Sequence, residues 1–190
     1  MKSVILNGSP RKGGATATVL KAMREELGRG GQVEWFDAYD LDIEPCAGCL
    51  GCRPNGDCVQ PSDDAQRVRA AISSADALIV GTPAYWGNMS APLKLIFDRN
   101  VTLFESFEKG LPSPKLKGKK AALVVASGAP WPFNHLPDSG GGAARSLRKI
   151  LRAGGMKIEG GIFVSGIGPG LPLPLGLAAK ARRISERLLG

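Results

Sequence analysis

The sequence predicts an α/β fold in which helices cover both faces of a doubly wound, five-stranded parallel sheet. Strand-like and helix-like segments alternate five times along the 190 residues. Runs such as 77–80 and 121–125 are continuously apolar, as expected of strands covered on both faces. Strand–helix units of this kind join parallel strands through right-handed crossovers. A chain of this length is expected to form one domain, residues 1–190, with a sizeable core.

The individual elements are placed by apolar runs and by helix start and stop signals. Ser62, Asp63 and Asp64 form an N-cap cluster for the second helix, and Gly30 or Gly31 is expected to end the first. We expect strands near residues 3–7, 32–37, 77–81, 120–126 and 158–164. We expect helices near residues 15–28, 62–75, 91–101, 139–153 and 175–189. Residues 166–174 are expected to link the last strand to the last helix.

The turn between the first strand and the first helix has the composition of a phosphate site. Residues 8–14 are rich in Gly, Ser and Pro. A strand that leads through such a turn into a helix directs backbone N–H groups and the positive end of the helix dipole at one point. Ser9, Arg11 and Thr16 add hydroxyl and guanidinium donors. We therefore expect this turn to hold the phosphate of a cofactor.

This turn matches neither the P-loop nor the dinucleotide-binding glycine motif. Gly8 and Gly13 have the spacing of a P-loop, but Gly14 stands where that loop needs a lysine, which argues against ATP chemistry. Pro10 takes the place of the second glycine in the pattern Gly-x-Gly-x-x-Gly. Asp37 has the spacing of the ribose-binding acid of a dinucleotide site, and it fits equally well as a loop residue. A mononucleotide is the better-supported ligand.

The loop after the third strand should meet the first turn, because ligands of such sheets bind beyond the carboxyl ends of the strands. Residues 81–92 are rich in turn formers and carry the adjacent aromatic residues Tyr85 and Trp86. A planar ring could lie against this loop, or the two aromatic residues could pack the loop onto the core. After the fourth strand, Ser127 and Gly128 are small enough to let a flat ligand approach.

The chain resembles the flavodoxin-like NAD(P)H-dependent FMN reductases over nearly its whole length. The resemblance rests on residues 8–11 (GSPR), on 81–88 (GTPAYWGN), and on Leu93-Lys94 followed by Asp98-Arg99. It implies a flavodoxin-like fold, FMN as cofactor and NAD(P)H as electron donor. The family often has Asn where this chain has Ala15. The loss of that polar side chain is expected to weaken phosphate binding slightly.

The resemblance also implies which residues bind the cofactor and how the chain assembles. The phosphate of FMN would be held by Ser9, Arg11 and Thr16. The isoalloxazine ring would be held by Pro83, Ala84, Tyr85, Trp86, Gly87 and Asn88, with Ser127 and Gly128 nearby. Such reductases commonly form dimers or tetramers with the flavin at the interface.

All four cysteines lie in one segment, residues 45–60, which we interpret as a cysteine-rich loop insertion. Cys46, Cys49, Cys52 and Cys58 have the spacing C-x2-C-x2-C-x5-C. Runs of this kind hold iron–sulfur clusters, and structural disulfides are not expected without an export signal. The spacing resembles that of the iron–sulfur flavoproteins, which carry a four-iron, four-sulfur (4Fe-4S) cluster near FMN. The alternative is that the cysteines hold no cluster and line a loop over the flavin or near a dimer contact.

The composition and charge of the chain limit the classes of function that it can have. Lys and Arg number 25 against 17 Asp and Glu, a net charge of +8, but no nucleic-acid motif is present. No apolar stretch approaches twenty residues and the N-terminus lacks a signal-peptide profile, so we expect a cytoplasmic protein. His135, the single histidine, is expected at the surface or at a ligand's edge, and no Ser-His-Asp set can be assembled.

These observations predict an FMN-dependent NAD(P)H oxidoreductase that passes electrons to a flavin, a quinone or a protein acceptor. No acid–base side chain is required, because the flavin carries the hydride chemistry. A protein electron partner and a homodimer or homotetramer are compatible with this assignment. Two alternatives remain: an electron carrier of the flavodoxin type, with or without the cluster, and a thiol- or metal-dependent regulatory protein that no longer uses its flavin site.

Overall fold

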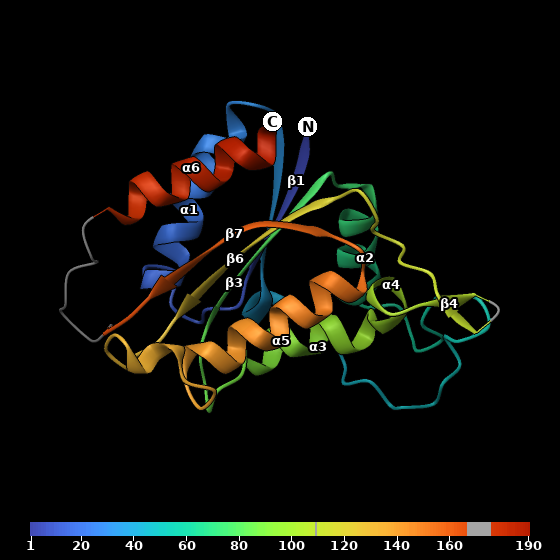
Figure 1. Cartoon of the computed structure of the whole chain (residues 1–190). Helices are drawn as coiled ribbons and strands as arrows, with labels where there is room; N and C mark the ends of the chain where they lie inside the picture. The colour runs from blue at the N-terminus through green and yellow to red at the C-terminus, as the bar shows by residue number, and fades with distance from the viewer. Residues whose placement is uncertain (109, 167–175) are drawn as a thin grey trace.

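The computed structural model describes residues 1–108, 110–166 and 176–190, and its centre is a five-stranded parallel sheet. The strand order is β2-β1-β3-β6-β7, which is the order of flavodoxin-like sheets and confirms the predicted fold class. Helices α1 and α6 cover one face, while α2, α3 and α5 lie on the other (Figure 1). The predicted linker at 166–174 falls almost wholly outside the described residues.

The elements follow one another along the chain as strand–helix units. The strands of the sheet are β1 (Lys2–Asn7), β2 (Gln32–Asp37), β3 (Ala77–Pro83), β6 (Lys120–Ala126) and β7 (Lys157–Val164). The α-helices are α1 (Ala15–Gly28), α2 (Asp64–Ser74), α3 (Ala91–Arg99), α4 (Val101–Phe104), α5 (Gly140–Ala153) and α6 (Leu177–Leu189). Two short 3-10 helices, η1 (Ala38–Asp40) and η2 (Phe133–His135), and a small hairpin of β4 (Phe107–Glu108) and β5 (Leu111–Pro112) complete the set.

Each face of the sheet buries its own apolar core, which explains the continuously apolar strands. Leu78 and Val80 of β3 point into the core under α2, α3 and α5. Ile79, between them in the chain, points into the core under α1 and α6. Successive side chains of a strand alternate between the two faces, so a strand covered on both sides needs apolar residues at every position. The structure therefore confirms and explains the strand that the apolar run 77–80 predicted.

The five predicted strands and five predicted helices are all present, with ends that differ by at most two residues. The helix expected at 91–101 is divided at Asn100, whose side-chain amide donates to Ala65 O and Ile96 O. Asp63 is the N-cap of α2 and forms a capping box with Gln66, as the N-cap cluster predicted. The first helix ends at Gly28 with Arg29 as its C-cap, so Gly30 directly follows the cap, as the predicted stop signal indicated.

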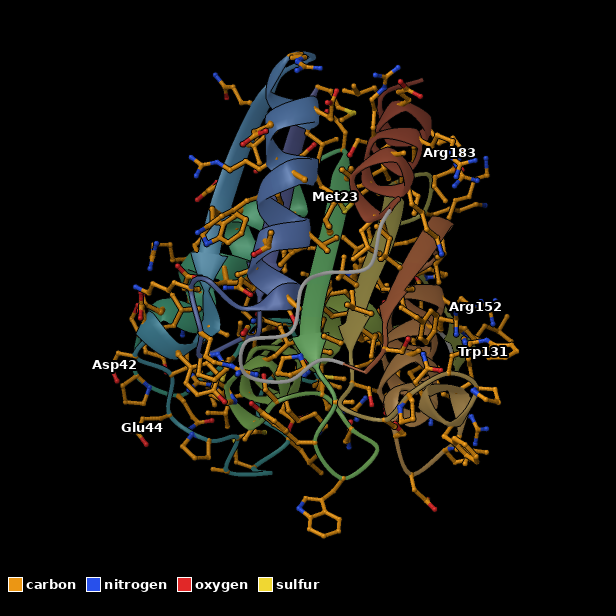
Figure 2. The ribbon with its side chains drawn as sticks, turned by 90° about the vertical axis from the view of Figure 1, so that its left-hand side faces the viewer. Met23, Asp42, Glu44, Trp131, Arg152 and Arg183 are labelled. Carbon is orange, nitrogen blue, oxygen red and sulfur yellow. The ribbon has the colours of Figure 1, made fainter. Side chains whose placement is uncertain are left out.

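The loops that follow the strands gather at one end of the molecule. Figure 2 shows Asp42, Glu44 and Trp131 toward the end where the strands finish, and Arg183 of α6 at the opposite end. All four strand pairings in the sheet are parallel. Every strand therefore ends at the same edge of the sheet, and the loops that follow the strands begin there. None of the helices in the described ranges is both long and apolar enough to cross a bilayer.

Candidate functional site

The first turn, residues 8–14, is held in shape by its own hydrogen bonds. The Ser9 hydroxyl accepts from Arg11 N at 3.3 Å, and Gly14 N donates to Arg11 O at 2.9 Å. Gly14 caps α1 through its backbone alone, so the first N–H groups of the helix have no intrahelical acceptor. The side chains of Ser9 and Thr16 are buried and that of Arg11 is exposed. The turn therefore combines oriented N–H groups with an accessible guanidinium.

The first turn lies directly against the end of β3. Gly8 N donates to Gly81 O at 2.7 Å. A Cβ at Gly8 would come within 2.9 Å of the Ser90 hydroxyl and 3.0 Å of Gly81 O, so glycine is needed for this approach. The structure therefore joins the bases of the first and third loops, as the topology predicted.

The third loop is a tighter structure than the sequence suggested. Tyr85 and Asn88 exchange two backbone hydrogen bonds of 2.9 Å, and the residues between them have positive φ, +50° at Trp86 and +71° at Gly87. This is a two-residue hairpin turn, for which positive φ at both positions is characteristic. Trp86 is fully exposed and Tyr85 about half exposed. Their packing onto the core, the alternative left open by the sequence, does not occur.

The fourth loop, residues 127–139, adjoins the third. Ala84 N donates to Ala126 O at 2.8 Å, and a Cβ at Gly87 would lie 2.4 Å from Pro137 O. Ser127 is buried and shares a 2.7 Å hydrogen bond with the Ser139 hydroxyl, whereas Gly128 is exposed. The three loops that carry the predicted cofactor residues are thus linked side by side at one edge of the sheet.

Sequence reasoning missed residues that the second strand brings to this edge. Burial raises the pKa of the Tyr39 phenol above its usual value, and the charge of Tyr85 adds to the rise. Lys12 forms a 2.5 Å ion pair with Asp40, and the hydrogen bond to that carboxylate raises the pKa of Lys12. The position of residues 38–40 directly after the second predicted strand is the signal that could have found them.

Asp37 is tied to the neighbouring strand. Its carboxylate accepts a 2.6 Å hydrogen bond from the Asn7 side chain, at the end of β1. Asn7 also accepts from Ser9 N at 3.2 Å, so Asp37 supports the first turn through Asn7. The structure therefore gives Asp37 a supporting contact to the first turn.

The cysteine segment crosses from η1 to α2 as irregular chain. Cys46 and Cys49 are exposed, Cys52 and Cys58 are partly buried, and all four thiols are free. Within the described ranges, no three Cys, His, Asp or Glu side chains converge on a point that could hold a metal. The structure therefore places the four predicted ligands in one segment but does not gather their sulfur atoms.

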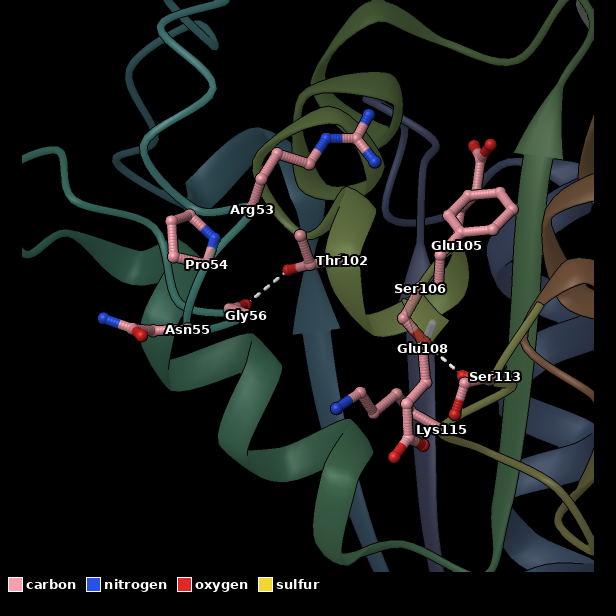
Figure 3. Close-up of a pocket in the computed structure, with 11 residues that line it drawn as sticks. Arg53, Pro54, Asn55, Gly56, Thr102, Glu105, Ser106, Glu108, Ser113 and Lys115 are labelled. Atoms are coloured by element: carbon pink, nitrogen blue, oxygen red, sulfur yellow. Dashed lines mark hydrogen bonds between the residues drawn. The ribbon is translucent and has the colours of Figure 1, made fainter. Parts of the chain in front are cut away.

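Part of this segment lines a cavity of about 370 Å³ beside the β4–β5 hairpin (Figure 3). Residues 53–56 form one wall, and Glu105, Ser106 and Lys115 contribute to the other. The Thr102 hydroxyl at the start of α4 donates to Gly56 O, as the dashed line in Figure 3 shows. The hydrogen bond fixes the turn between Cys52 and Cys58.

Arg99, at the end of α3, ties the two ends of the cysteine segment together. Its buried guanidinium donates from Nη1 to Glu44 O at 2.7 Å and to the Asp63 carboxylate at 2.5 Å. Burial alone would lower the pKa of Arg99, but the adjacent Cys58 thiol and the Asp63 carboxylate more than offset it, so the pKa lies above its usual value. Sequence reasoning assigned no role to Arg99 beyond its place in the family pattern.

A sequence model of the NADPH-dependent FMN reductase family matches residues 1–169. An iron-sulfur flavoprotein of Archaeoglobus fulgidus is 31% identical over 172 residues, which cover 90% of this chain and 71% of that protein. The chain spans about half the length of several other iron-sulfur flavoproteins that it matches, 56% in Methanocaldococcus jannaschii and 46% in Clostridioides difficile.

Solved structures share the fold. An NAD(P)H:quinone oxidoreductase from Methanothermobacter marburgensis superposes with a TM-score of 0.71 at 22% identity, covering 100% of this chain and 98% of that one. A flavodoxin from the domain Archaea superposes with a TM-score of 0.58 at 15% identity, covering 100% and 96%. At these identities the likeness establishes the flavodoxin-like fold.

Proposed function

This chain belongs to the NADPH-dependent FMN reductase family, and we propose that it passes electrons from NADH or NADPH through bound FMN to an acceptor. The observation that carries the proposal is the linkage of three loops at the switch edge of the sheet. The bonds Gly8 N to Gly81 O and Ala84 N to Ala126 O place the phosphate turn, the aromatic hairpin and the Ser127 loop next to one another. This edge is where doubly wound sheets bind their ligands.

The residues of the first turn fit the phosphate of FMN. The start of α1 offers N–H groups that have no intrahelical acceptor, and the exposed Arg11 adds a cation. Hydrogen bonds that involve a charged partner are stronger than neutral ones, which favours a dianion over an uncharged ligand here. Ser9 in this turn and Thr16 in the first turn of α1 supply hydroxyls.

The residues of the third and fourth loops fit the ring. The Tyr85–Asn88 hairpin presents aromatic side chains at the edge of the sheet. Gly128 is exposed and small, so a flat ligand could approach the fourth loop closely. When bound, FMN supplies hydride acceptance from the reduced nicotinamide. The protein's part is to orient the two rings and to exclude water, and no acid–base side chain is assigned to the reaction.

Anaerobic mixing of the FMN-loaded protein with NADH or NADPH tests this proposal. The flavin absorbance should bleach with either or both donors, and a quinone or free flavin should then sustain continuous donor consumption. Bleaching without continued consumption would indicate an electron carrier. A protein that stays colourless in excess FMN would contradict the proposal and favour the regulatory alternative.

A second function, electron transfer through an iron–sulfur cluster, is favoured by the chemistry around Cys58. Two nitrogen atoms of the buried Arg99, Nε and Nη2, lack a hydrogen-bond partner within the described ranges. A buried cation with unused donors that lines the same cavity as Cys58 would suit an anionic cluster. We propose Cys46, Cys49, Cys52 and Cys58 as its ligands. A bound cluster would pass single electrons onward, and the thiols would have to draw together to hold it.

Iron and acid-labile sulfide analysis of anaerobically purified protein tests the second function. The proposal predicts about four of each per chain, as in a four-iron, four-sulfur cluster. Iron-free protein that also fails anaerobic reconstitution would exclude the cluster and leave the FMN proposal intact.

A further inference from the structure

A basic groove lies where α5, the edge strand β7 and the fourth loop meet. Its volume is about 660 Å³, and no Asp or Glu is among the residues that line it. The cations that line it are spaced i, i+3, i+4 and i+7 along α5, so they share one side of the helix. They are Arg145, Arg148, Lys149 and Arg152. We call this cavity the α5 groove.

The cations of the α5 groove have no carboxylate to neutralise them. Within the described ranges none of the four forms an ion pair, and α5 itself contains no acidic residue. The residues outside those ranges, 109 and 167–175, include no Asp or Glu that could supply a partner. On α3 and α6, by contrast, cations pair with carboxylates four residues along the same helix. Like charges one helical turn apart repel each other, so a bound anion would stabilise the row on α5.

The α5 groove also has an aromatic wall. The ring centroids of His135 and Phe163 lie 4.9 Å apart, and the Arg148 guanidinium lies 5.5 Å from the centroid of the Phe163 ring. An arginine stacked on an aromatic ring keeps its N–H donors at the rim of the guanidinium plane, where they can bind a phosphate in pairs. Cations beside aromatic rings favour a ligand that carries a flat ring as well as an anionic group.

The α5 groove adjoins the edge of the sheet at which we place FMN. Phe163 precedes Val164, whose carbonyl oxygen accepts a 2.8 Å hydrogen bond from Ser127 N. His135 belongs to the same fourth loop as Ser127. The groove therefore begins next to the residues proposed to lie near the flavin ring.

The cations of the groove extend away from that edge along α5. The helix begins at Gly140, directly after the fourth loop. At about 1.5 Å per residue, Arg145 and Arg148 lie about 8 and 12 Å along the helix axis from its start. Figure 2 shows Arg152, further along α5, on the same side of the molecule as Trp131 of the fourth loop. A ligand that reacts at the flavin and also reaches these cations must be extended.

We propose that the α5 groove binds the 2′-phosphate of NADPH, and that Arg145 and Arg148 select NADPH over NADH. This inference rests on the proposed function, because it concerns the donor that reduces FMN. NADPH differs from NADH only by that phosphate, and dinucleotide sites accommodate it with an arginine near the ribose. The phosphate of FMN is assigned to the first turn, so FMN leaves the cations of the α5 groove available. The His135–Phe163 wall offers a surface against which the adenine can stack.

Calorimetric titration of the FMN-loaded protein tests the phosphate site without turnover. The probes are adenosine 2′,5′-bisphosphate and adenosine 5′-monophosphate, of which only the first carries the 2′-phosphate. We expect the bisphosphate to bind about tenfold more tightly or better, and Arg145→Gln/Arg148→Gln to lose this preference. Gln has a helix propensity close to that of Arg, so α5 should be retained. Arg183→Gln/Arg187→Gln removes two charges from a basic cavity of about 630 Å³ on α6 and should keep the preference.

Steady-state reduction of a quinone measures the same selectivity during turnover. We expect the wild type to have a kcat/KM for NADPH that exceeds that for NADH by about tenfold or more. Arg145→Gln/Arg148→Gln should raise the KM for NADPH by a similar factor and leave its kcat unchanged, because the 2′-phosphate takes no part in the reaction. The kinetic constants for NADH should stay within about twofold of the wild type, whereas a damaged fold would lower activity with both donors.

The outcomes separate this inference from the proposed function. Equal kcat/KM values for the two donors, or equal affinities for the two adenosine phosphates, would overturn the inference while FMN reduction stands. Equal losses in the α5 and α6 double variants would also overturn it, because the effect would then come from overall charge. If neither donor bleaches the flavin, the proposed function fails and the role of the groove in donor binding fails with it.

Discussion

At the scale of single residues, Arg11 gives the most direct access to the phosphate turn. Its guanidinium is exposed at the tip of residues 8–14, where it can reach a bound dianion. Arg11→Ala should remove a charge-assisted contact worth about 1.5–3 kcal/mol, which weakens FMN binding roughly tenfold to 150-fold. Calorimetric titration of FMN-free protein measures the change. Arg24→Ala, an exposed arginine on α1 that lies over Trp35, is the matched control and should bind FMN as the wild type does.

Substitution of Gly87 tests whether the hairpin turn of residues 85–88 shapes the flavin site. Any side chain there meets two penalties: φ is +71°, and a Cβ would lie 2.4 Å from the backbone oxygen of Pro137. Gly110 has φ +79° with open space around it, so Gly110→Ala carries only the backbone cost of about 1 kcal/mol. Gly87→Ala should destabilise the fold by about 1–3 kcal/mol more, because the hairpin must move away from the fourth loop.

Denaturant unfolding and FMN titration of both glycine variants measure these effects. Weaker FMN binding in Gly87→Ala, with normal binding in Gly110→Ala, is the expected pattern. Equal FMN affinities in the two variants would show that the hairpin does not shape the flavin site.

Residues of the site were predictable from sequence where their role is local. Ser9 and Arg11 lie in one turn with Thr16 at the start of the helix that follows, and Tyr85 to Asn88 form another turn. Short sequence patterns were therefore enough to propose these residues as candidates. Arg99 could not be assigned a role, because its partner Asp63 is 36 positions away and its burial depends on how α2 and α3 pack. Tyr39 was missed for a similar reason, since it joins the other loops only when β2 takes its place beside β1 in the sheet.

At the scale of elements, the Arg99–Asp63 pair holds the start of α2 to the end of α3. The arginine is fully buried and the aspartate nearly so. Asp63→Asn would leave the guanidinium buried without its counter-charge, and we expect a loss of about 3–5 kcal/mol in the free energy of unfolding. Glu186→Gln breaks an exposed pair with Arg182 on α6 and should cost less than about 1 kcal/mol.

Denaturant unfolding of the wild type, Asp63→Asn and Glu186→Gln measures the two losses in the free energy of unfolding. If Asp63→Asn cost no more than Glu186→Gln, the Arg99–Asp63 pair would not be an anchor of the cysteine segment.

The elements themselves were largely predictable because the sheet is covered on both faces. Continuous apolar runs at β3 and β6 have no other simple explanation in a chain of this length. The β4–β5 hairpin was missed because strands of two residues carry no periodic signal. The division between α3 and α4 was missed because Asn100 takes its partner Ala65 O from α2, a tertiary contact.

At the scale of the whole molecule, the exposed aromatic residues point to self-association. Trp86, Trp131 and Phe133 are strongly exposed, and all three lie on loops at the site edge. Exposed apolar side chains of this size are typical of interaction surfaces. We therefore expect a homodimer or homotetramer, and the double variant Trp86→Ser/Trp131→Ser should shift it toward the monomer.

Sedimentation velocity of the wild-type protein and of the Trp86→Ser/Trp131→Ser variant checks this expectation. Leu111→Ser is the control, because Leu111 is about as exposed as Trp131 but lies on the β4–β5 hairpin. A wild-type protein that sediments as a monomer, or an assembly that only Leu111→Ser disrupts, would place the interface elsewhere.

The central claim is that the first turn holds a phosphate while the neighbouring loops hold the ring attached to it. Parallel titrations of FMN-free protein with FMN and with riboflavin, which lacks the phosphate, test this claim most directly. Several contacts of about 1.5–3 kcal/mol each predict that FMN binds at least a hundredfold more tightly. Equal affinities for the two ligands, or no binding of either, would contradict it.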